Sequence, residues 1–400
     1  MSQQKIHPRT LKGFRDYLPE AMLPRERIME TARRVFRSYG FSPIDTPALE
    51  YLEILLGKGS AETDRQLYRF QDHGGRDVGL RFDLTVPLAR FAAQHLGEIG
   101  TPFKRYQIAT VWRGENTQRG RYREFMQCDF DTIGTTGVAS DIETILVVND
   151  LLSELRVGGF QIHINHRGIL SGLIEKLGLA EKTVEVLRAL DKLGKIGPEG
   201  VAEELSRTAG STAAQNEKLL ELSSLDGSHA EIMSELDTLV AGNEVGETGV
   251  SRLREILAGV GAALAQPAVD RVRVEPSIAR GLDYYTGLVL ETTLEDLPDI
   301  GSVCSGGRYD NLAELYTKEH LPGIGASLGL DRLLAAMETL NLIEPVRTPA
   351  EVFVPFFAAT RLGDYLRLAA ELRSAGLGVE VYPEPKKLGK QVQYADKRGF

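Results

Sequence analysis

Cysteine is scarce in this sequence: among 400 residues, only Cys128 and Cys304 occur. Two cysteines so far apart build neither a disulfide framework nor a zinc site, and such sparing use is typical of a reducing compartment. Long apolar runs are missing as well, because stretches such as 144–148 are far too short to cross a bilayer. No apolar run follows the basic residues near the N-terminus, which argues against a signal peptide. We therefore expect a cytoplasmic protein without a membrane partner.

Basic residues do not dominate the composition either. The formal net charge is -9, which taken alone argues against nucleic-acid binding. The charge is unevenly spread: residues 175–255 hold 16 acidic and 9 basic side chains, a net charge of -7, whereas residues 104–123 hold 6 basic and 1 acidic. A locally basic segment in an acidic protein fits a ligand with several phosphates, although an ordinary solvated run of charges is the commoner explanation.

Two familiar nucleotide signatures are absent. No GxxxxGK[ST] stretch exists, which excludes a P-loop protein. The glycine-rich residues 323–329 look like a dinucleotide fingerprint, but they hold one residue too many and no good strand precedes them. What remains is a soluble composition, with 42% hydrophobic residues, that is large enough for two or three domains.

Alternation and helical periodicity predict an α+β fold. Apolar residues at helical spacing favour a helix over 20–39, and strict alternation predicts strands over 106–113 and 123–131. The second of these strands carries Gln127 and Asp131 on one face. Further elements are expected as a helix over 139–155 and as strands over 160–165, 271–275 and 287–293. Residues 167–270 are helical and acidic in character, and we interpret them as an insertion between two halves of one sheet domain.

A third region begins near residue 348. It reads as strand 352–357, helix 363–375, strand 378–382 and helix 391–397. This order predicts a βαβα unit with parallel strands. The sequence ends at Phe400, where a further strand is expected.

Polar motifs stand at intervals along the predicted sheet. They are residues 38–47 (SYGFSPIDTP), 80–85 (LRFDLT), 111–115 (VWRGE), 120–131 (GRYREFMQCDFD), 280–287 (RGLDYYTG), 305–310 (SGGRYD) and 325–332 (GASLGLDR). Together they resemble the histidyl-tRNA synthetases, a class II family, along nearly the whole chain. RGLDYYTG and SGGRYD are long and specific to that family.

The resemblance implies an architecture. It implies a class II catalytic domain over 1–345 with an antiparallel sheet, interrupted by the helical insertion 167–270. It also implies an α/β anticodon-binding domain over 346–400, which is shorter than in the family and therefore incomplete. The motif at 38–47 resembles the dimer-interface motif, so a homodimer is expected.

The resemblance also assigns an ATP site. It places Arg113 at the α-phosphate, Arg332 at the γ-phosphate and Arg121 at the outer phosphates, because a planar guanidinium grips phosphate in a bidentate way. Phe125 is expected to stack on adenine. The two further residues expected there are Glu115 and Arg280, the latter in place of a metal ion that related synthetases hold near the α-phosphate. Mg²⁺ is expected with ATP, but no site made of protein ligands alone.

The amino-acid site follows in the same way. The family holds the histidine ammonium group with residues that match Asp83, Thr85 and Gln127, and we expect Asp83 and Thr85 on one strand face. It reads the imidazole with residues that match Asp131 and Tyr285. Tyr284 is expected to line the same pocket. Gln118 and Arg119 belong to a loop that resembles the family loop at the tRNA acceptor end. Taken alone, each arginine fits a surface salt bridge and each tyrosine a core aromatic.

The function implied is activation of L-histidine with ATP to histidyl-adenylate and pyrophosphate, and transfer of histidine to the 3′ end of its tRNA. No protein general base, catalytic histidine or reactive cysteine is expected. One alternative is the synthetase-like regulatory subunit of ATP phosphoribosyltransferase, a binding module that usually lacks the RGLDYY signature and the C-terminal domain. A second is a synthetase-like sensor that binds uncharged tRNA without catalysis.

Overall fold

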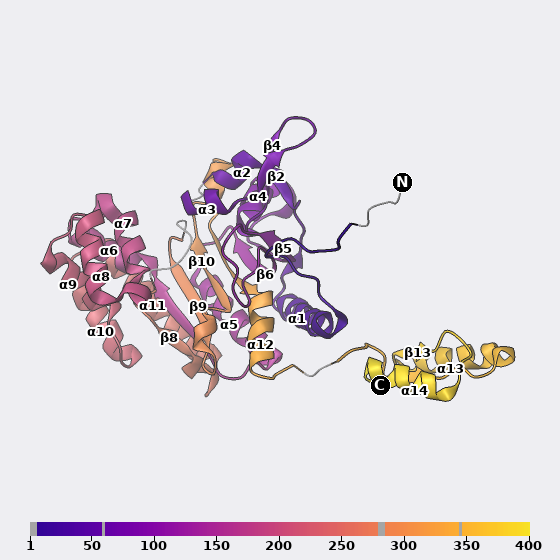
Figure 1. The fold of residues 1–400 in the computed structure, drawn as a ribbon. Helices are drawn as coiled ribbons and strands as arrows, with labels where there is room; N and C mark the ends of the chain where they lie inside the picture. Colours follow the sequence, from indigo (N-terminus) through magenta and orange to yellow (C-terminus); the bar gives the residue numbers. More distant parts are fainter. Residues whose placement is uncertain (1–5, 58–60, 279–284, 344–345) are drawn as a thin grey trace. The chain divides into compact units, whose positions relative to one another are not determined.

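The computed structural model describes residues 6–57, 61–278, 285–343 and 346–400 (Figure 1). The chain divides into two compact units, one of Thr31–Leu340 and one that joins Met1–Glu30 to Asn341–Phe400. Within the described residues, no helix is both long enough and apolar enough to cross a membrane.

An eight-stranded sheet organises the larger unit, with the order β1-β5-β6-β11-β10-β9-β7-β8. Its strands are β1 (Ser42–Pro43), β5 (Phe103–Trp112), β6 (Glu124–Ile133), β7 (Phe160–His166), β8 (Val272–Val274), β9 (Leu288–Leu294), β10 (Cys304–Tyr309) and β11 (Gly323–Gly329). The pairs β1–β5 and β7–β8 are parallel, and the other pairs are antiparallel. The fold is therefore mixed α/β with a mostly antiparallel sheet, and a doubly wound parallel sheet is excluded for this unit.

One face of this sheet packs against helices. The aromatic ring of Phe36 in α1 (Pro19–Ser38) lies 5.1 Å from the ring of Phe130 on β6. On the same face, Arg308 of β10 forms a buried ion pair of 2.8 Å with Asp141 of α5 (Val138–Leu155). Because side chains alternate along a strand, the odd-numbered residues 127, 129 and 131 of β6 lie on the opposite face.

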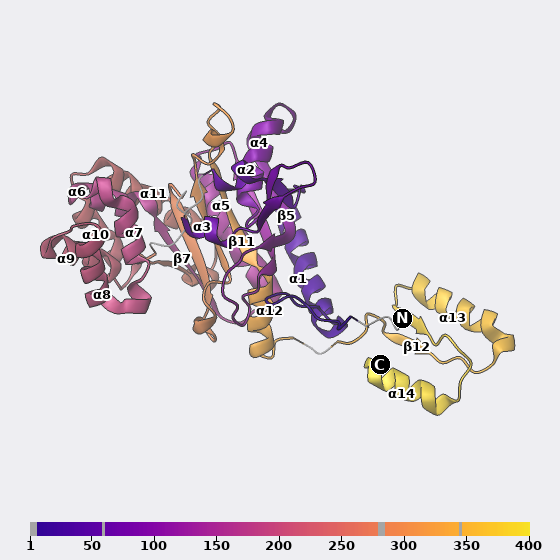
Figure 2. The same ribbon diagram turned by 45° about the horizontal axis from the view of Figure 1, so that its top comes forward.

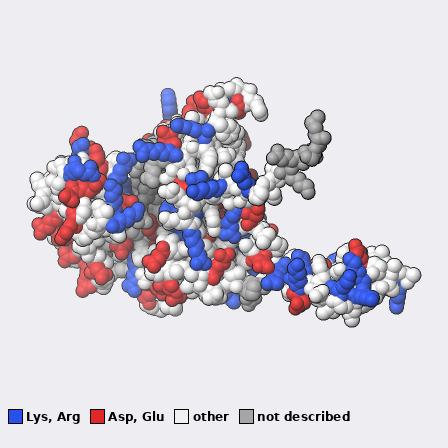
Figure 3. Space-filling model, in the orientation of Figure 1, with Lys and Arg blue, Asp and Glu red and all other residues white. Residues whose placement is uncertain are grey.

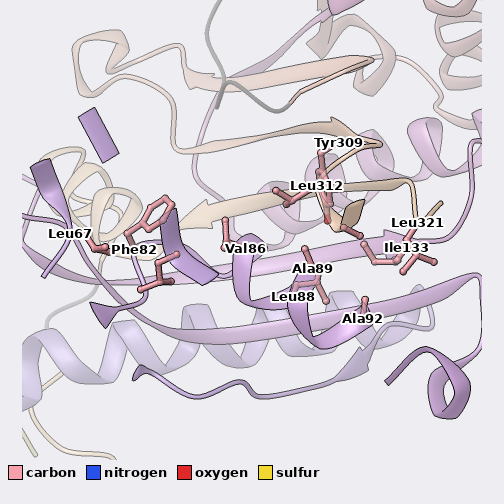
Figure 4. Close-up of a cluster of buried hydrophobic side chains, with 12 residues drawn as sticks. Leu67, Phe82, Val86, Leu88, Ala89, Ala92, Ile133, Tyr309, Leu312 and Leu321 are labelled. Carbon is pink, nitrogen blue, oxygen red and sulfur yellow. The ribbon is translucent and has the colours of Figure 1, made fainter. Parts of the chain in front are cut away.

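The opposite face is partly covered by α4 (Thr85–Ile99) and by a small sheet of order β2-β4-β3. Its strands are β2 (Leu49–Tyr51), β3 (Arg69–Gln71) and β4 (Asp77–Leu80), and the nearby helices are α2 (Leu52–Leu56) and α3 (Ala61–Gln66). A buried apolar cluster joins α4 to the sheet: Figure 4 shows Val86 and Ala89 beside Ile133, Leu312 and Tyr309. This cluster fixes the beginning of α4 next to the polar residues of β6.

Helices fill the segment between β7 and β8. They are α6 (Arg167–Lys176), α7 (Thr183–Leu190), α8 (Leu193–Thr208), α9 (Ala213–Ser223), α10 (His229–Val240) and α11 (Glu244–Ala263). Figure 2 shows them gathered beside the β7 end of the sheet. Acidic side chains cover the surface of α8–α10 in Figure 3, while Lys and Arg side chains lie over the neighbouring part of the sheet. The charge asymmetry of the sequence is thus an asymmetry of the surface.

The smaller unit contains the parallel strand pair that the sequence predicts. Its elements after residue 340 are β12 (Val352–Val354), α13 (Leu362–Ser374), β13 (Val379–Val381) and α14 (Leu388–Arg398), and β12 pairs in parallel with β13. Val354, Ala369 and Val379 form its apolar core. The fully buried Gln391 donates to the carbonyl oxygen of Phe356 and accepts from its backbone N–H, each at 2.7 Å.

Candidate active site

A hollow of about 140 Å³ opens on the exposed part of the sheet face that carries Gln127. Its walls come from the β5–β6 hairpin, from β10 and β11, and from the first turn of α12 (Leu330–Thr339). Arginine side chains supply most of its charge, namely Arg113, Arg121 and Arg332. Segments more than 200 residues apart in sequence therefore build one cationic cavity.

Each of these arginines is held by a contact that leaves part of its guanidinium group available. Arg113 donates from Nε to the carbonyl oxygen of Phe82 at 2.9 Å, and its guanidinium carbon lies 5.2 Å from the centroid of the Phe125 ring. Arg332 donates from Nη1 to the carbonyl oxygen of Ser302 at 2.6 Å. A planar guanidinium carries five N–H donors, so one such bond leaves others for a ligand.

The charged residues that line the hollow carry a net positive charge. Burial lowers the pKa of Arg332, and the positive charges of Arg121 and Arg113 lower it further, while Glu115 acts in the opposite direction. Glu115 also forms an ion pair of 3.3 Å with Arg121. The hollow is thus lined by three guanidinium groups and two carboxylates, Glu115 and Asp331, and this net positive charge favours an anion.

A glycine turn brings the hairpin against α12. Gly120 has φ +70°, and a Cβ atom on it would lie 3.2 Å from the Cα atom of Arg332. Gln118 and Arg121 close this turn with two backbone hydrogen bonds of 3.1 and 2.9 Å, which leaves the exposed side chains of Gln118 and Arg119 at its tip. At the end of β6 away from this turn, the side chains on the same sheet face are acidic and buried.

That acidic end contains a group of fully buried charges. Asp83, Asp129 and Asp131 are 2–3% exposed, and Arg105 is 0% exposed. Arg105 lies directly across the β5–β6 pair from Asp131, and its Nη2 atom is 2.7 Å from an oxygen of that carboxylate. Tyr309 donates its hydroxyl to the other oxygen of Asp131. The structure thus places three carboxylates around one guanidinium group.

Burial dominates the acidity of these carboxylates. It raises the pKa of Asp83 and of Asp131, and the positive charge of Arg105 opposes the rise in both. Burial also raises the pKa of Asp129 to about 7, against Arg105 and a hydrogen bond from Ser327, while the negative charge of Asp131 adds to the rise. An oxygen of Asp83, Oδ2, and one of Asp129, Oδ1, have no hydrogen-bond partner. Unpartnered buried acceptors of this kind are typical of a site that receives a donor from a ligand.

Tyr285 faces the same group of acids. Burial raises the pKa of its hydroxyl, and the negative charges of Asp131, Asp129 and Asp83 raise it further, so the hydroxyl stays protonated and can donate. Two glycines make room for this arrangement. A Cβ atom on Gly307 would lie 3.0 Å from the Tyr285 ring, and one on Gly325 would lie 2.2 Å from Oδ1 of Asp131.

Comparison with known proteins identifies the family. The family model described as histidyl-tRNA synthetase matches residues 13–333. The chain is also 64% identical over 395 residues to a histidine–tRNA ligase of Rhodopirellula baltica, a match that covers 99% of this chain and 89% of that protein. The chain belongs to the histidyl-tRNA synthetase family.

Solved structures agree with this membership. The crystal structure of histidyl-tRNA synthetase from Nostoc sp. PCC 7120 superposes with a TM-score of 0.88 at 36% identity, covering 99% of this chain and 90% of that one. A structure from Bacillus halodurans C described as an ATP phosphoribosyltransferase regulatory subunit/histidyl-tRNA synthetase has a TM-score of 0.82 at 24% identity, covering 98% and 97%. At that identity the likeness shows the shared fold alone.

One expectation about the histidyl-tRNA synthetase motifs was wrong. Asp83 and Thr85 do not share a strand face, because β4 ends at Leu80 and Thr85 is the first residue of α4. Asp83 instead accepts a hydrogen bond of 3.0 Å from the backbone N–H of Val86 in the first helical turn. The first N–H groups of a helix lack partners within the helix, and an aspartate just before it supplies one.

The other expected residues fall into three groups. The structure brings Arg113, Arg121, Phe125 and Arg332 together at the hollow, with Glu115 beside them. It also brings Asp83, Asp131 and Tyr285 together, with Gln127 on the same sheet face as Asp131. Arg280 and Tyr284 lie outside the described residues. Sequence reasoning missed Arg105, Asp129, Tyr309 and Ser327. Strand alternation already put Asp129 between Gln127 and Asp131, and pairing of the two hairpin strands would have put Arg105 opposite Asp131.

The two histidines singled out in the sequence have structural partners. A ring nitrogen of His163 lies 3.0 Å from the Thr293 hydroxyl, and Nδ1 of His166 accepts from the backbone N–H of Gly168 at the start of α6. Burial, with Arg252 and Arg308 nearby, lowers the pKa of His166 to about 4, so it stays neutral. Among the described residues, no three His, Cys, Asp or Glu side chains gather as metal ligands.

Proposed function

We propose that this protein activates L-histidine with ATP, giving histidyl-adenylate and pyrophosphate, and then transfers histidine to the 3′ end of its tRNA. The observation that carries the proposal is the juxtaposition on one sheet face of a cationic hollow and a buried acidic pocket. Gln127 belongs to both, because it lines the hollow and precedes Asp129 and Asp131 along β6. Such a face can hold an α-phosphate next to an amino acid.

ATP fits the hollow because the arginine side chains match its phosphate groups in charge and in hydrogen-bond geometry. In the proposal Arg113 contacts the α-phosphate, Arg332 the γ-phosphate and Arg121 the outer phosphates, while adenine stacks on Phe125. Arg280 adds a cation near the α-phosphate, where charge grows during in-line attack by the histidine carboxylate. Mg²⁺ would accompany the nucleotide and offset its phosphate charge, and Glu115, which lines the hollow, would be the carboxylate that helps to hold it.

Histidine fits the acidic pocket by its two polar ends. Asp83, Thr85 and Gln127 receive the ammonium group, and the unpartnered oxygens Asp83 Oδ2 and Gln127 Oε1 are acceptors for its N–H groups. Asp131 and Tyr285 form hydrogen bonds with the imidazole, and Tyr284 lines the pocket. Arg105 and Tyr309 hold Asp131 in place, and each carboxylate oxygen keeps a further lone pair for an imidazole N–H.

No side chain is needed as a general base in this scheme. The histidine carboxylate is already a nucleophile, and the tRNA hydroxyl can pass its proton to a phosphate oxygen of the adenylate. The chain supplies orientation and fixed positive charge, which together account for much of the rate in such transfers. Gln118 and Arg119, at the exposed hairpin tip, meet the acceptor end of the tRNA.

The finer architecture belongs to the same proposal. Residues 1–345 form a class II catalytic domain with residues 167–270 as its helical insertion, and residues 346–400 form an anticodon-binding-like α/β domain. Two chains form a homodimer through the segment 38–47. The protein works in the cytoplasm, where its tRNA is charged.

Histidine-dependent exchange between ATP and pyrophosphate tests the reaction. We expect exchange with L-histidine and none with other amino acids, followed by formation of histidyl-tRNA when the tRNA is added. Binding of histidine without any exchange would instead favour a regulatory subunit of ATP phosphoribosyltransferase. Binding of uncharged tRNA with neither exchange nor charging would favour a sensor module. Sedimentation of the purified protein tests the homodimer separately.

A further inference from the structure

Three polar side chains form a row across β6 and β11 at the junction of the hollow and the acidic pocket. Ser327 of β11 is the direct cross-strand partner of Asp129 of β6. Gln127, two residues before Asp129, donates from Nε2 to the Ser327 hydroxyl oxygen at 2.7 Å. The Ser327 hydroxyl also interacts with the Asp129 carboxylate across the strand pair and lowers its pKa. Gln127 and Asp129 are buried, at 8% and 2% exposed, whereas Ser327 is partly exposed and lines the hollow.

The chemistry of these groups gives the row a direction. An ionised carboxylate only accepts hydrogen bonds, and a hydroxyl has one proton to donate. The Ser327 proton therefore goes to Asp129, and the Ser327 oxygen must accept from its other neighbour. Only the NH₂ end of the Gln127 amide can donate to it. The orientation of the Gln127 amide therefore follows from the carboxylate at the far end of the row.

The opposite end of the Gln127 amide is then left facing away from Ser327. Its carbonyl oxygen, Oε1, is buried and has no hydrogen-bond partner. A buried carbonyl without a partner destabilises a folded protein unless something binds it. An ammonium group, which only donates, satisfies such an oxygen. A reversed amide would point its N–H groups at the ammonium and repel it.

We propose that Asp129 and Ser327 are positioning residues, which fix the Gln127 amide so that its carbonyl oxygen receives the ammonium group of histidine. This inference rests on the proposed function, since it assumes that the ammonium lies at Gln127. Asp129 acts through Ser327 and does not touch the substrate. Arg105 on β5 supports the arrangement, because its positive charge favours the ionised form of Asp129 against the negative charges of Asp131 and Asp83.

The test uses histidine-dependent ATP–pyrophosphate exchange with the full chain at pH 8, above the pKa of about 7 for Asp129. Ser327→Ala removes the link between Asp129 and Gln127. We expect the KM for histidine to rise about tenfold, equivalent to about 1.4 kcal/mol, because the amide is no longer fixed. The KM for ATP should change less than about twofold. Ser327→Thr keeps a hydroxyl and should restore most of the histidine affinity, and Asp129→Asn, which can accept or donate, should give an intermediate loss.

A double-mutant cycle separates positioning from a general structural effect. In a Gln127→Ala background, Ser327→Ala should raise the KM for histidine no further, since the amide that it positions is gone. An equal rise in both backgrounds, or an unchanged histidine KM for Ser327→Ala alone, would overturn the inference. Melting temperatures of all variants show whether each is folded. If the unmodified protein shows no histidine-dependent exchange, the proposed function fails; if it does and Ser327→Ala matches it, only the role of Ser327 and Asp129 fails.

Discussion

Replacement of Arg105 by methionine tests the buried charge group at the acidic end of the sheet face. The Arg105 side chain is 0% exposed and lies 2.7 Å from Asp131. Its positive charge lowers the pKa of Asp83, Asp129 and Asp131, all of which burial raises. Methionine has a similar length but no charge, so the variant leaves these carboxylates without their common counter-ion.

The magnitude follows from the cost of breaking a buried ion pair. Removal of one partner typically lowers the free energy of unfolding by about 3–5 kcal/mol, because the other charge is left unpaired in a poorly solvating place. The pH dependence has a definite sign. Without Arg105, the three carboxyl pKa values rise further above their values in the unfolded chain, so the folded state binds more protons than the unfolded state. Stability of the variant therefore falls as pH increases.

Urea unfolding of the unmodified protein and of Arg105→Met at pH 6 and pH 8 measures this effect. We expect the variant to be less stable at both values and the difference to be larger at pH 8. Arg308→Met is the matched control, because it removes a buried arginine from the other sheet face. Its partner Asp141 keeps a second ion pair, of 2.7 Å, with Arg252. A difference for Arg105→Met that stays constant or shrinks at pH 8 would refute the reasoning.

Three further substitutions probe the site. Asp131→Asn should weaken histidine binding by about 1–3 kcal/mol and leave ATP binding nearly unchanged; equal weakening of both ligands with a lower melting temperature would mean that Asp131 only supports the fold beside Arg105. Arg280→Ala should raise the activation barrier of exchange by about 3 kcal/mol, measured through kcat. Near-normal exchange would show that Arg280 does not take part in the reaction. Gly325→Ala should reduce histidine affinity and stability together, because the added methyl group would sit 2.2 Å from Asp131 Oδ1; an unaltered melting curve and KM would contradict that close contact.

Local patterns in the sequence were sufficient to predict most of the large elements. Alternation gave the strands that became β5 and β6, and helical periodicity gave α1, because each depends only on which side chains are buried along one segment. The short strands β2 and β3, of three residues each, escaped prediction. A strand of that length is defined by its hydrogen-bonded neighbour more than by its own composition.

The site could be predicted only where a motif carried it. Arg113 and Arg332 were found through the resemblance, and the structure adds that they meet at one hollow. Arg105 and Ser327 were missed because their importance comes from cross-strand partners, which a single strand does not reveal. Asp83 was placed on a strand although the proline at position 87 favours the first turn of a helix, where no N–H is required. The roles of Arg280 and Tyr284, the homodimer and the anticodon-binding domain stay predictions.

The position of β8 has a consequence for how this protein can vary. The segment from Arg167 to Arg271 leaves the sheet after β7 and returns only to add β8, a three-residue strand at the sheet's border. The strands around the hollow, β5, β6, β10 and β11, are separated from that border by β9 and β7. Changes of length or charge in α7–α10 would therefore leave unchanged the register on which the arginines and acids depend. Helix α11 is more constrained, because its Arg252 forms an ion pair of 2.7 Å with Asp141 of α5.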